Sequence, residues 1–147
     1  MNIGEILSEA TGEIVRNYRD LKVFKKAREL AAITMRVTSG FPRSDRSNLS
    51  AQMRNAASSI SANIAEGYRK FSTREYIRYL KIAYGSCAEL ESRSLIVHDA
   101  GWISEPDYLR MVELQDAISR MLWKMIQSLQ RRLESQKNRP QRTSAES

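Results

Sequence analysis

Three basic side chains, Arg74, Arg78 and Lys81, are spaced so that a helix would place them on one face. Their spacing of i, i+4 and i+7 follows the helical repeat, and the face begins near an expected helix start, where backbone amides also favour anions. Cations grouped in this way are suited to bind the phosphates of a nucleic acid. The same charges are also typical of a solvated helix face that binds no partner, and this alternative stays open.

Further cations surround this group in the sequence. Arg69 and Lys70 come immediately before the expected helix, and we expect Arg43 and Arg46, in an earlier connection, to approach the same cluster. The candidate nucleic-acid-binding residues are therefore Arg43, Arg46, Arg69, Lys70, Arg74, Arg78 and Lys81.

The overall charge agrees with a polyanionic partner. The 147-residue chain has 24 Lys and Arg against 17 Asp and Glu, which gives a net charge of +7 and a pI near 9.8. Most of the excess falls in residues 20–71, whose net charge is +6. This balance favours nucleic acid as a partner, although it says nothing about the fold.

The residues that most enzymes need are scarce. With one histidine, His98, and one cysteine, Cys87, soft ligands alone cannot form a zinc site. The chain has no G-x-S-x-G nucleophile motif and no Glu-x-x-His motif of the kind that di-iron bundles use. We therefore expect a non-enzymatic protein with no catalytic residue, no metal and no cofactor.

Cysteine usage and hydropathy indicate the compartment. A single cysteine excludes an internal disulfide framework and fits a reducing environment. No apolar run approaches the ~20 residues that a membrane helix needs, and the first residues lack the layout of a secretory signal. We expect a cytoplasmic protein with no membrane partner.

Helix start and stop residues divide the chain. Asp20 is expected to cap the first long helix, Gly67 to end the second, and Ser72 to open the third through a capping box with Glu75. Ser104, followed by a proline and two acids, opens the last helix. The expected helices span residues 20–38, 47–66, 72–100 and 104–136.

These elements predict an all-α protein. Four helices with short connections pack as antiparallel neighbours, which predicts an up-down-up-down four-helix bundle over residues 20–136. Residues 1–19 are expected to form an amphipathic arm or short helix. Residues 137–147 are polar and basic, and are expected to form a disordered tail.

The last helix has more apolar surface than one core requires. The stripe that suits the core consists of Tyr108, Met111, Ile118, Leu122, Met125 and Leu129. A second, rotated stripe suits contact with another copy of the chain. The predicted oligomer interface consists of Leu109, Val112, Trp123, Ile126 and Leu133. The alternative is that the amphipathic N-terminal segment folds back over the second stripe.

Three segments resemble a known family. They are DLKVFKKA at residues 20–27, SISANIAEGY at residues 59–68 and YIRYLKIAYGSCAELE at residues 76–91. They are similar to the bacterial four-helix bundle proteins named after intervening sequences in 23S ribosomal RNA genes, over about residues 18–134.

The resemblance implies a fold and an assembly. The family resembles the accessory variability proteins of diversity-generating retroelements, which form homopentameric rings, bind nucleic acid through a basic surface and associate with a reverse transcriptase. It therefore implies a pentamer that binds RNA or DNA, with a reverse transcriptase as an expected partner. The alternative function is a protein–protein scaffold ring with no nucleic-acid partner.

Overall fold

The protein is built from α-helices. The computed structural model describes residues 1–140, except for the side chains of residues 45–47, and within that part it contains no strand. This confirms the all-α class. The five α-helices are α1 (Ile3–Thr11), α2 (Lys22–Ser39), α3 (Ala51–Tyr68), α4 (Thr73–Asp99) and α5 (Glu105–Lys137).

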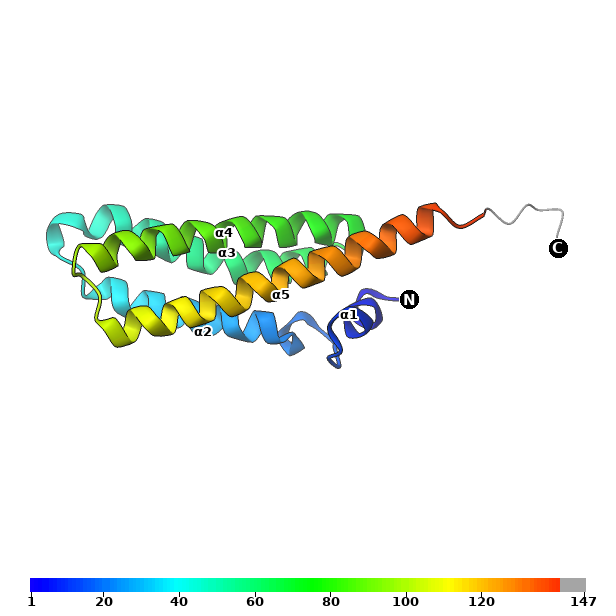
Figure 1. The fold of residues 1–147 in the computed structure, drawn as a ribbon, viewed down its shortest axis with the longest axis horizontal. Helices are drawn as coiled ribbons and strands as arrows, with labels where there is room; N and C mark the ends of the chain where they lie inside the picture. Colours follow the sequence, from blue (N-terminus) through cyan, green and yellow to red (C-terminus); the bar gives the residue numbers. More distant parts are fainter. Residues whose placement is uncertain (141–147) are drawn as a thin grey trace.

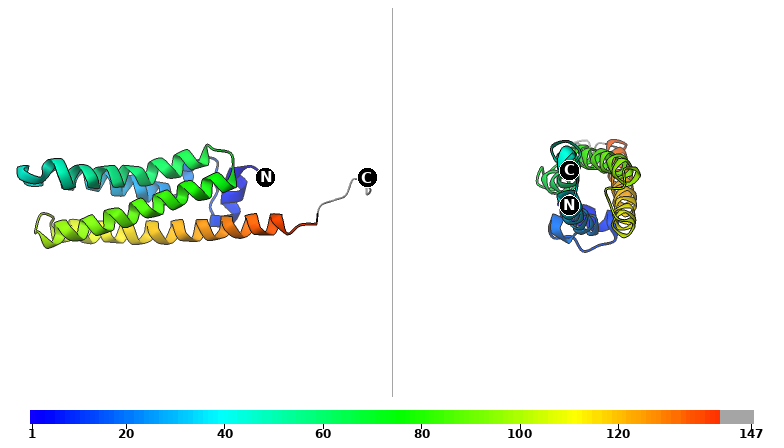
Figure 2. Two further views of the ribbon diagram at one scale, coloured as in Figure 1. Left: turned by 90° about the horizontal axis from the view of Figure 1, so that it is seen from above. Right: turned by 90° about the vertical axis from the view of Figure 1, so that its left-hand side faces the viewer.

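The four long helices lie side by side (Figure 1). Helix α2 contacts α3 and α5, and α4 contacts the same two helices, so the four enclose a common core. Successive helices run in opposite directions, and the end view shows them around one axis (Figure 2). The molecule is therefore elongated, with the α3–α4 turn at one end and the α2–α3 and α4–α5 connections at the other.

The core is mostly apolar, with one buried polar contact in which the Gln115 amide donates to the Ser94 hydroxyl at 3.0 Å. Leu30, Ile60, Leu80 and Leu122, one from each long helix, are fully buried. Burial of such a side chain stabilises a fold by about 1.5–3 kcal/mol. The core stripe expected on the last helix is buried at Met111, Ile118, Leu122, Met125 and Leu129, whereas Tyr108 is half-buried.

The N-terminal segment is part of the packed structure. Leu7 of α1 is fully buried, and α1 contacts α5. At this contact the Arg132 guanidinium lies 3.0 Å from the Glu9 carboxylate. The expected arm is therefore a short helix that covers part of α5.

The cap at the start of α2 was predicted wrongly. The Asp20 carboxylate accepts hydrogen bonds from the backbone amides of Arg16 (2.8 Å) and Asn17 (3.0 Å), which lowers the pKa of Asp20. Asp20 thus closes the 3-10 turn η1 (Tyr18–Asp20), and α2 begins after Leu21, whose side chain provides no cap. Asp20 therefore lies one residue before the N-cap position of α2, and its carboxylate is occupied by the turn.

Ser72 and Ser104 are confirmed as helix caps, but the capping box expected at Ser72 is only half formed, and the Glu75 carboxylate instead accepts from Arg78. The Ser72 and Ser104 hydroxyls accept from the amides of Glu75 and Asp107, each at 3.3 Å. Helix α3 starts later than expected, at Ala51, because residues 43–50 form two short turns of 3-10 and π type.

The C-terminal boundary differs slightly from the expected one. Lys137, the first residue of the predicted tail, belongs to α5. Residues 141–147 lie outside the described part of the chain. Within residues 1–140, no helix combines the length and apolar character needed to cross a membrane.

Gly67 permits the close approach of α3 and α4. The residue does not end its helix, since α3 continues to Tyr68. A Cβ atom placed on Gly67 would lie 2.5 Å from a ring carbon of Tyr76 and 2.6 Å from the Cβ atom of Tyr79. Tyr76 is fully buried, and the Tyr79 Cβ is fixed by the backbone of α4, so neither neighbour can retreat easily.

We therefore predict opposite effects of alanine at two helical glycines. Gly67→Ala should lower the free energy of unfolding by about 1–3 kcal/mol, because it overpacks the α3–α4 contact. Gly85→Ala is the matched control, since nothing lies within 4 Å of an added Cβ there, and it should raise stability by about 0.5–1 kcal/mol. Urea denaturation measures both values, and a stabilised Gly67→Ala variant would contradict the close-approach role.

Candidate nucleic-acid interface

The predicted basic face of α4 is exposed. Arg74, Arg78 and Lys81 all have exposed side chains near the start of this helix. Arg74 and Lys81 form no ion pair with any described residue, so their charges are available to an external anion.

Arg78 is partly engaged within the protein. Its guanidinium lies 3.1 Å from the Glu75 carboxylate, and the hydrogen bonds from Arg78 to Glu75 raise the arginine pKa. The same group stands 4.7 Å from the centre of the Tyr79 ring. Arg78 is therefore held in one place, with its charge partly compensated by Glu75.

The α3–α4 turn adds two more exposed cations. Lys70 stands 5.5 Å from the centre of the Tyr79 ring, on which Arg78 also lies. Arg69 stands 5.8 Å from the centre of the Tyr18 ring. Ring faces attract cations without neutralising them, so these contacts order the side chains and leave their charge available.

The expected approach of Arg43 is wrong. Arg43 lies in the connection that precedes α3, whereas Arg69 and Lys70 follow its last turn. The 18 residues of α3 span about 27 Å, and Figure 1 shows the two connections at opposite ends. The length of α3 separates these cations, and the side chain of Arg46 lies outside the described residues.

Two cations that the sequence did not point to join the cluster instead. Arg19 stands 5.4 Å from the centre of the Tyr18 ring, which Arg69 also approaches. Arg16 is tied to the same end, because the Tyr68 hydroxyl donates to its carbonyl oxygen at 3.0 Å. The signal that could have found them is the R-N-Y-R run at residues 16–19, where basic residues flank an aromatic residue.

We call this set the basic end. Its described members are Arg16, Arg19, Arg69, Lys70, Arg74, Arg78 and Lys81. They come from η1 and the segment before it, from the α3–α4 turn and from α4. The arrangement offers several cations to one polyanion.

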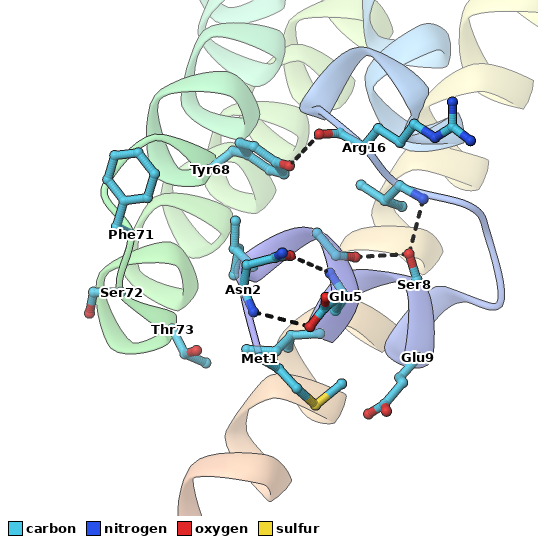
Figure 3. A pocket seen from close by; sticks show the side chains of 14 residues that line it. Met1, Asn2, Glu5, Ser8, Glu9, Arg16, Tyr68, Phe71, Ser72 and Thr73 are labelled. Atoms are coloured by element: carbon cyan, nitrogen blue, oxygen red, sulfur yellow. Dashed lines mark hydrogen bonds between the residues drawn. The ribbon is translucent and has the colours of Figure 1, made fainter.

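An open groove of about 960 Å³ lies beside the basic end (Figure 3). Its walls come from α1 on one side and from the α3–α4 turn on the other, where Phe71, Ser72 and Thr73 line it. The α1 wall carries the carboxylates of Glu5 and Glu9. The groove thus carries both signs of charge, because Arg16 of the basic end also lines it and Glu9 is paired with Arg132.

Cys87 and His98, the single cysteine and the single histidine, both have structural roles. Burial raises the pKa of the Cys87 thiol to about 11, so it stays protonated at neutral pH. The His98 ring lies 2.7 Å from the Glu105 carboxylate and stacks on Tyr108 at the α4–α5 connection. Among the described residues, no group of three His, Cys, Asp or Glu side chains is placed to hold a metal ion.

The predicted oligomer stripe on α5 divides into two parts. Leu109 and Trp123 are 56% and 52% exposed, and Val112 is half-buried. Ile126 was assigned wrongly, because it is buried in the core of its own chain. Leu133 is half-buried and packs against that core. The rotated stripe turns inward there because α1 packs beside this part of α5.

Helix α4 extends the exposed part of this stripe. The ring of Tyr84 lies 5.9 Å from that of Trp123, measured between ring centroids, and Leu95 is 52% exposed. Tyr84 and Leu95 share one face of α4 at helical spacing. We call Tyr84, Leu95, Leu109, Val112 and Trp123 the α4–α5 apolar face; the two residues of α4 were not predicted.

Comparisons with known proteins agree with this fold. Residues 19–124 match the family described as 23S rRNA-intervening sequence protein. A crystal structure of a protein of unknown function from the S23 ribosomal protein family of Bacteroides thetaiotaomicron is 23% identical in sequence. The match covers 71% of this chain and 95% of that one, with a TM-score of 0.66. No curated protein matches the sequence.

Proposed function

The chain belongs to the 23S rRNA-intervening sequence protein family, and from this premise we propose that it is a non-enzymatic, homo-oligomeric nucleic-acid-binding protein. The observation that carries the proposal is the basic end, in which seven cations gather from three segments of the chain. Arg74 and Lys81 are the strongest evidence for binding within this set, because both are exposed and neither is paired with an acid among the described residues.

The proposed platform is an antiparallel four-helix bundle formed by α2–α5. Its packed core holds the α3–α4 turn and the first turns of α4 in a fixed relation. A rigid scaffold of this kind reduces the entropy lost when phosphates bind to several cations at once. Each phosphate that is neutralised also releases counterions, so the affinity should fall steeply as salt rises.

Self-association would multiply this surface. The α4–α5 apolar face leaves two large side chains, Trp123 and Leu109, more than half exposed, and exposed apolar patches commonly mark protein interfaces. Copies joined through this face would present several basic ends to one strand, which raises the effective concentration of binding sites. The resemblance implies five copies.

The expected protein partner is a reverse transcriptase, which stays a prediction. A protein–protein scaffold ring is the second candidate function, and the exposed α4–α5 apolar face favours it. The two functions differ in whether the isolated protein binds nucleic acid at low salt.

We predict that charge reversal at the basic end severely weakens nucleic-acid binding. The double variant Arg74→Glu, Lys81→Glu should reduce affinity by more than about tenfold at low salt, because it replaces phosphate attraction by repulsion. Its salt dependence should also be shallower, by about one slope unit for each phosphate that the variant leaves without a cation. Fluorescence anisotropy with labelled RNA and DNA at several salt concentrations measures both quantities.

Arg43→Glu is the matched control for this test. It makes the same kind of charge change at the opposite end of the molecule, so it should leave affinity near the wild-type value. Equal weakening by the two sets of substitutions would show that net charge alone governs binding. Absence of binding by the wild-type protein at low salt, together with capture of a defined protein partner, would favour the scaffold function.

A second prediction concerns assembly. Trp123→Glu combined with Leu109→Glu should convert the oligomer to single chains at micromolar concentration, since each places a charge in the proposed interface. Multi-angle light scattering measures the mass, and circular dichroism checks that the helices remain. Met35→Glu is the control, because Met35 is a similarly exposed apolar residue on α2. A wild-type protein that is already a single chain would refute the interface.

A further inference from the structure

Phe71 has an unusual position in the α3–α4 turn. Its side chain is 87% exposed, the highest exposure among the large apolar residues of the described chain. Its backbone has φ +55°, and Phe71 is the only described residue other than glycine with a positive φ. A β-carbon is strained in this left-handed region, which glycine occupies freely.

The phenyl ring therefore serves neither the turn nor the core. Glycine would satisfy the backbone of the turn with less strain, and the ring buries little surface in its own chain. Backbone strain of this kind is often found at functional sites. The charges around the Phe71 ring indicate which kind of ligand could stack on it.

Charge around Phe71 differs from one side to the other. Lys70 precedes it, Arg74 follows three residues later, and Arg69 is held close by against Tyr18. Across the groove, α1 presents Glu5 and Glu9 (Figure 3). Glu9 is paired with Arg132 at 3.0 Å, and Arg16 also lines the groove. A phosphate chain that passes the ring is attracted to the cations of the α3–α4 turn and of the first turns of α4.

We propose that Phe71 is a stacking platform for an unpaired base of a single-stranded nucleic acid, with Lys70 and Arg74 holding the neighbouring phosphates. This inference rests on the proposed function and names its substrate class. Stacking on aromatic rings is available to any unpaired base, whereas bases inside a duplex are already stacked on their neighbours. The basic end alone would bind both forms, and Phe71 would give the preference for single strands.

The test compares single-stranded and duplex probes. Anisotropy is measured with labelled oligo(dT), oligo(U) and a DNA duplex of equal length, and the two single strands distinguish DNA from RNA. Phe71→Gly should weaken single-strand binding on the order of tenfold and leave duplex binding unchanged. Because glycine relieves the positive φ, this variant should fold at least as well as the wild type. Phe71→Trp should retain the single-strand affinity.

Ile96→Ala removes another exposed apolar side chain, near the opposite end of α4, and should change neither affinity. If the wild type binds nucleic acid and Phe71→Gly binds single strands equally well, the stacking proposal is overturned and the proposed function stands. If the wild type binds none of the three probes, both fail. A smaller oligomer for Phe71→Gly in light scattering would assign the ring to an interface between copies and would also overturn the proposal.

Discussion

The close packing of α3 against α4 is the constraint on which the site depends. At Gly67 the two helices approach until a single methyl group would collide with Tyr76 and the backbone-fixed part of Tyr79. Farther along the same contact, the hydroxyls of Ser59 and Ser86 lie 2.8 Å apart. Small residues at this seam thus bring the helices together. The position of Tyr79 follows, and with it the positions of the two cations, Lys70 and Arg78, that lie on its ring.

Aromatic rings organise the basic end with little loss of charge. Tyr18 and Tyr79 each attract two cations from different segments of the chain. A carboxylate in the same place would hold the cations more firmly and would cancel their charge, as Glu75 does in part for Arg78. The rings therefore keep a concentration of like charges at one end of an elongated molecule, where a polyanion can reach it.

The position of α1 decides which part of the apolar stripe on α5 is covered. The short helix α1 packs beside the C-terminal part of α5, where Ile126 belongs to the core and Leu133 packs against it. Nearer the start of α5, Leu109 and Trp123 remain exposed, together with Tyr84 and Leu95 of α4. One chain thus covers part of its surplus apolar stripe and leaves the rest exposed. The folded-back N-terminus accounts for the covered part, and a second copy is our proposal for the exposed part.

The sequence by itself determined the helical class, the four long helices to within a few residues, the serine caps of α4 and α5, the core stripe of α5 and the exposed face with Arg74, Arg78 and Lys81. These features depend on periodicity and on hydrogen bonds within a few residues, which local sequence specifies. Only the tertiary structure decided that Arg43 lies far from the cluster, that Arg16 and Arg19 join it, and that Ile126 is internal. Each of these three results depends on which ends and faces of different helices meet. The packing of the whole core sets those contacts. The spacing of residues along one helix does not specify them.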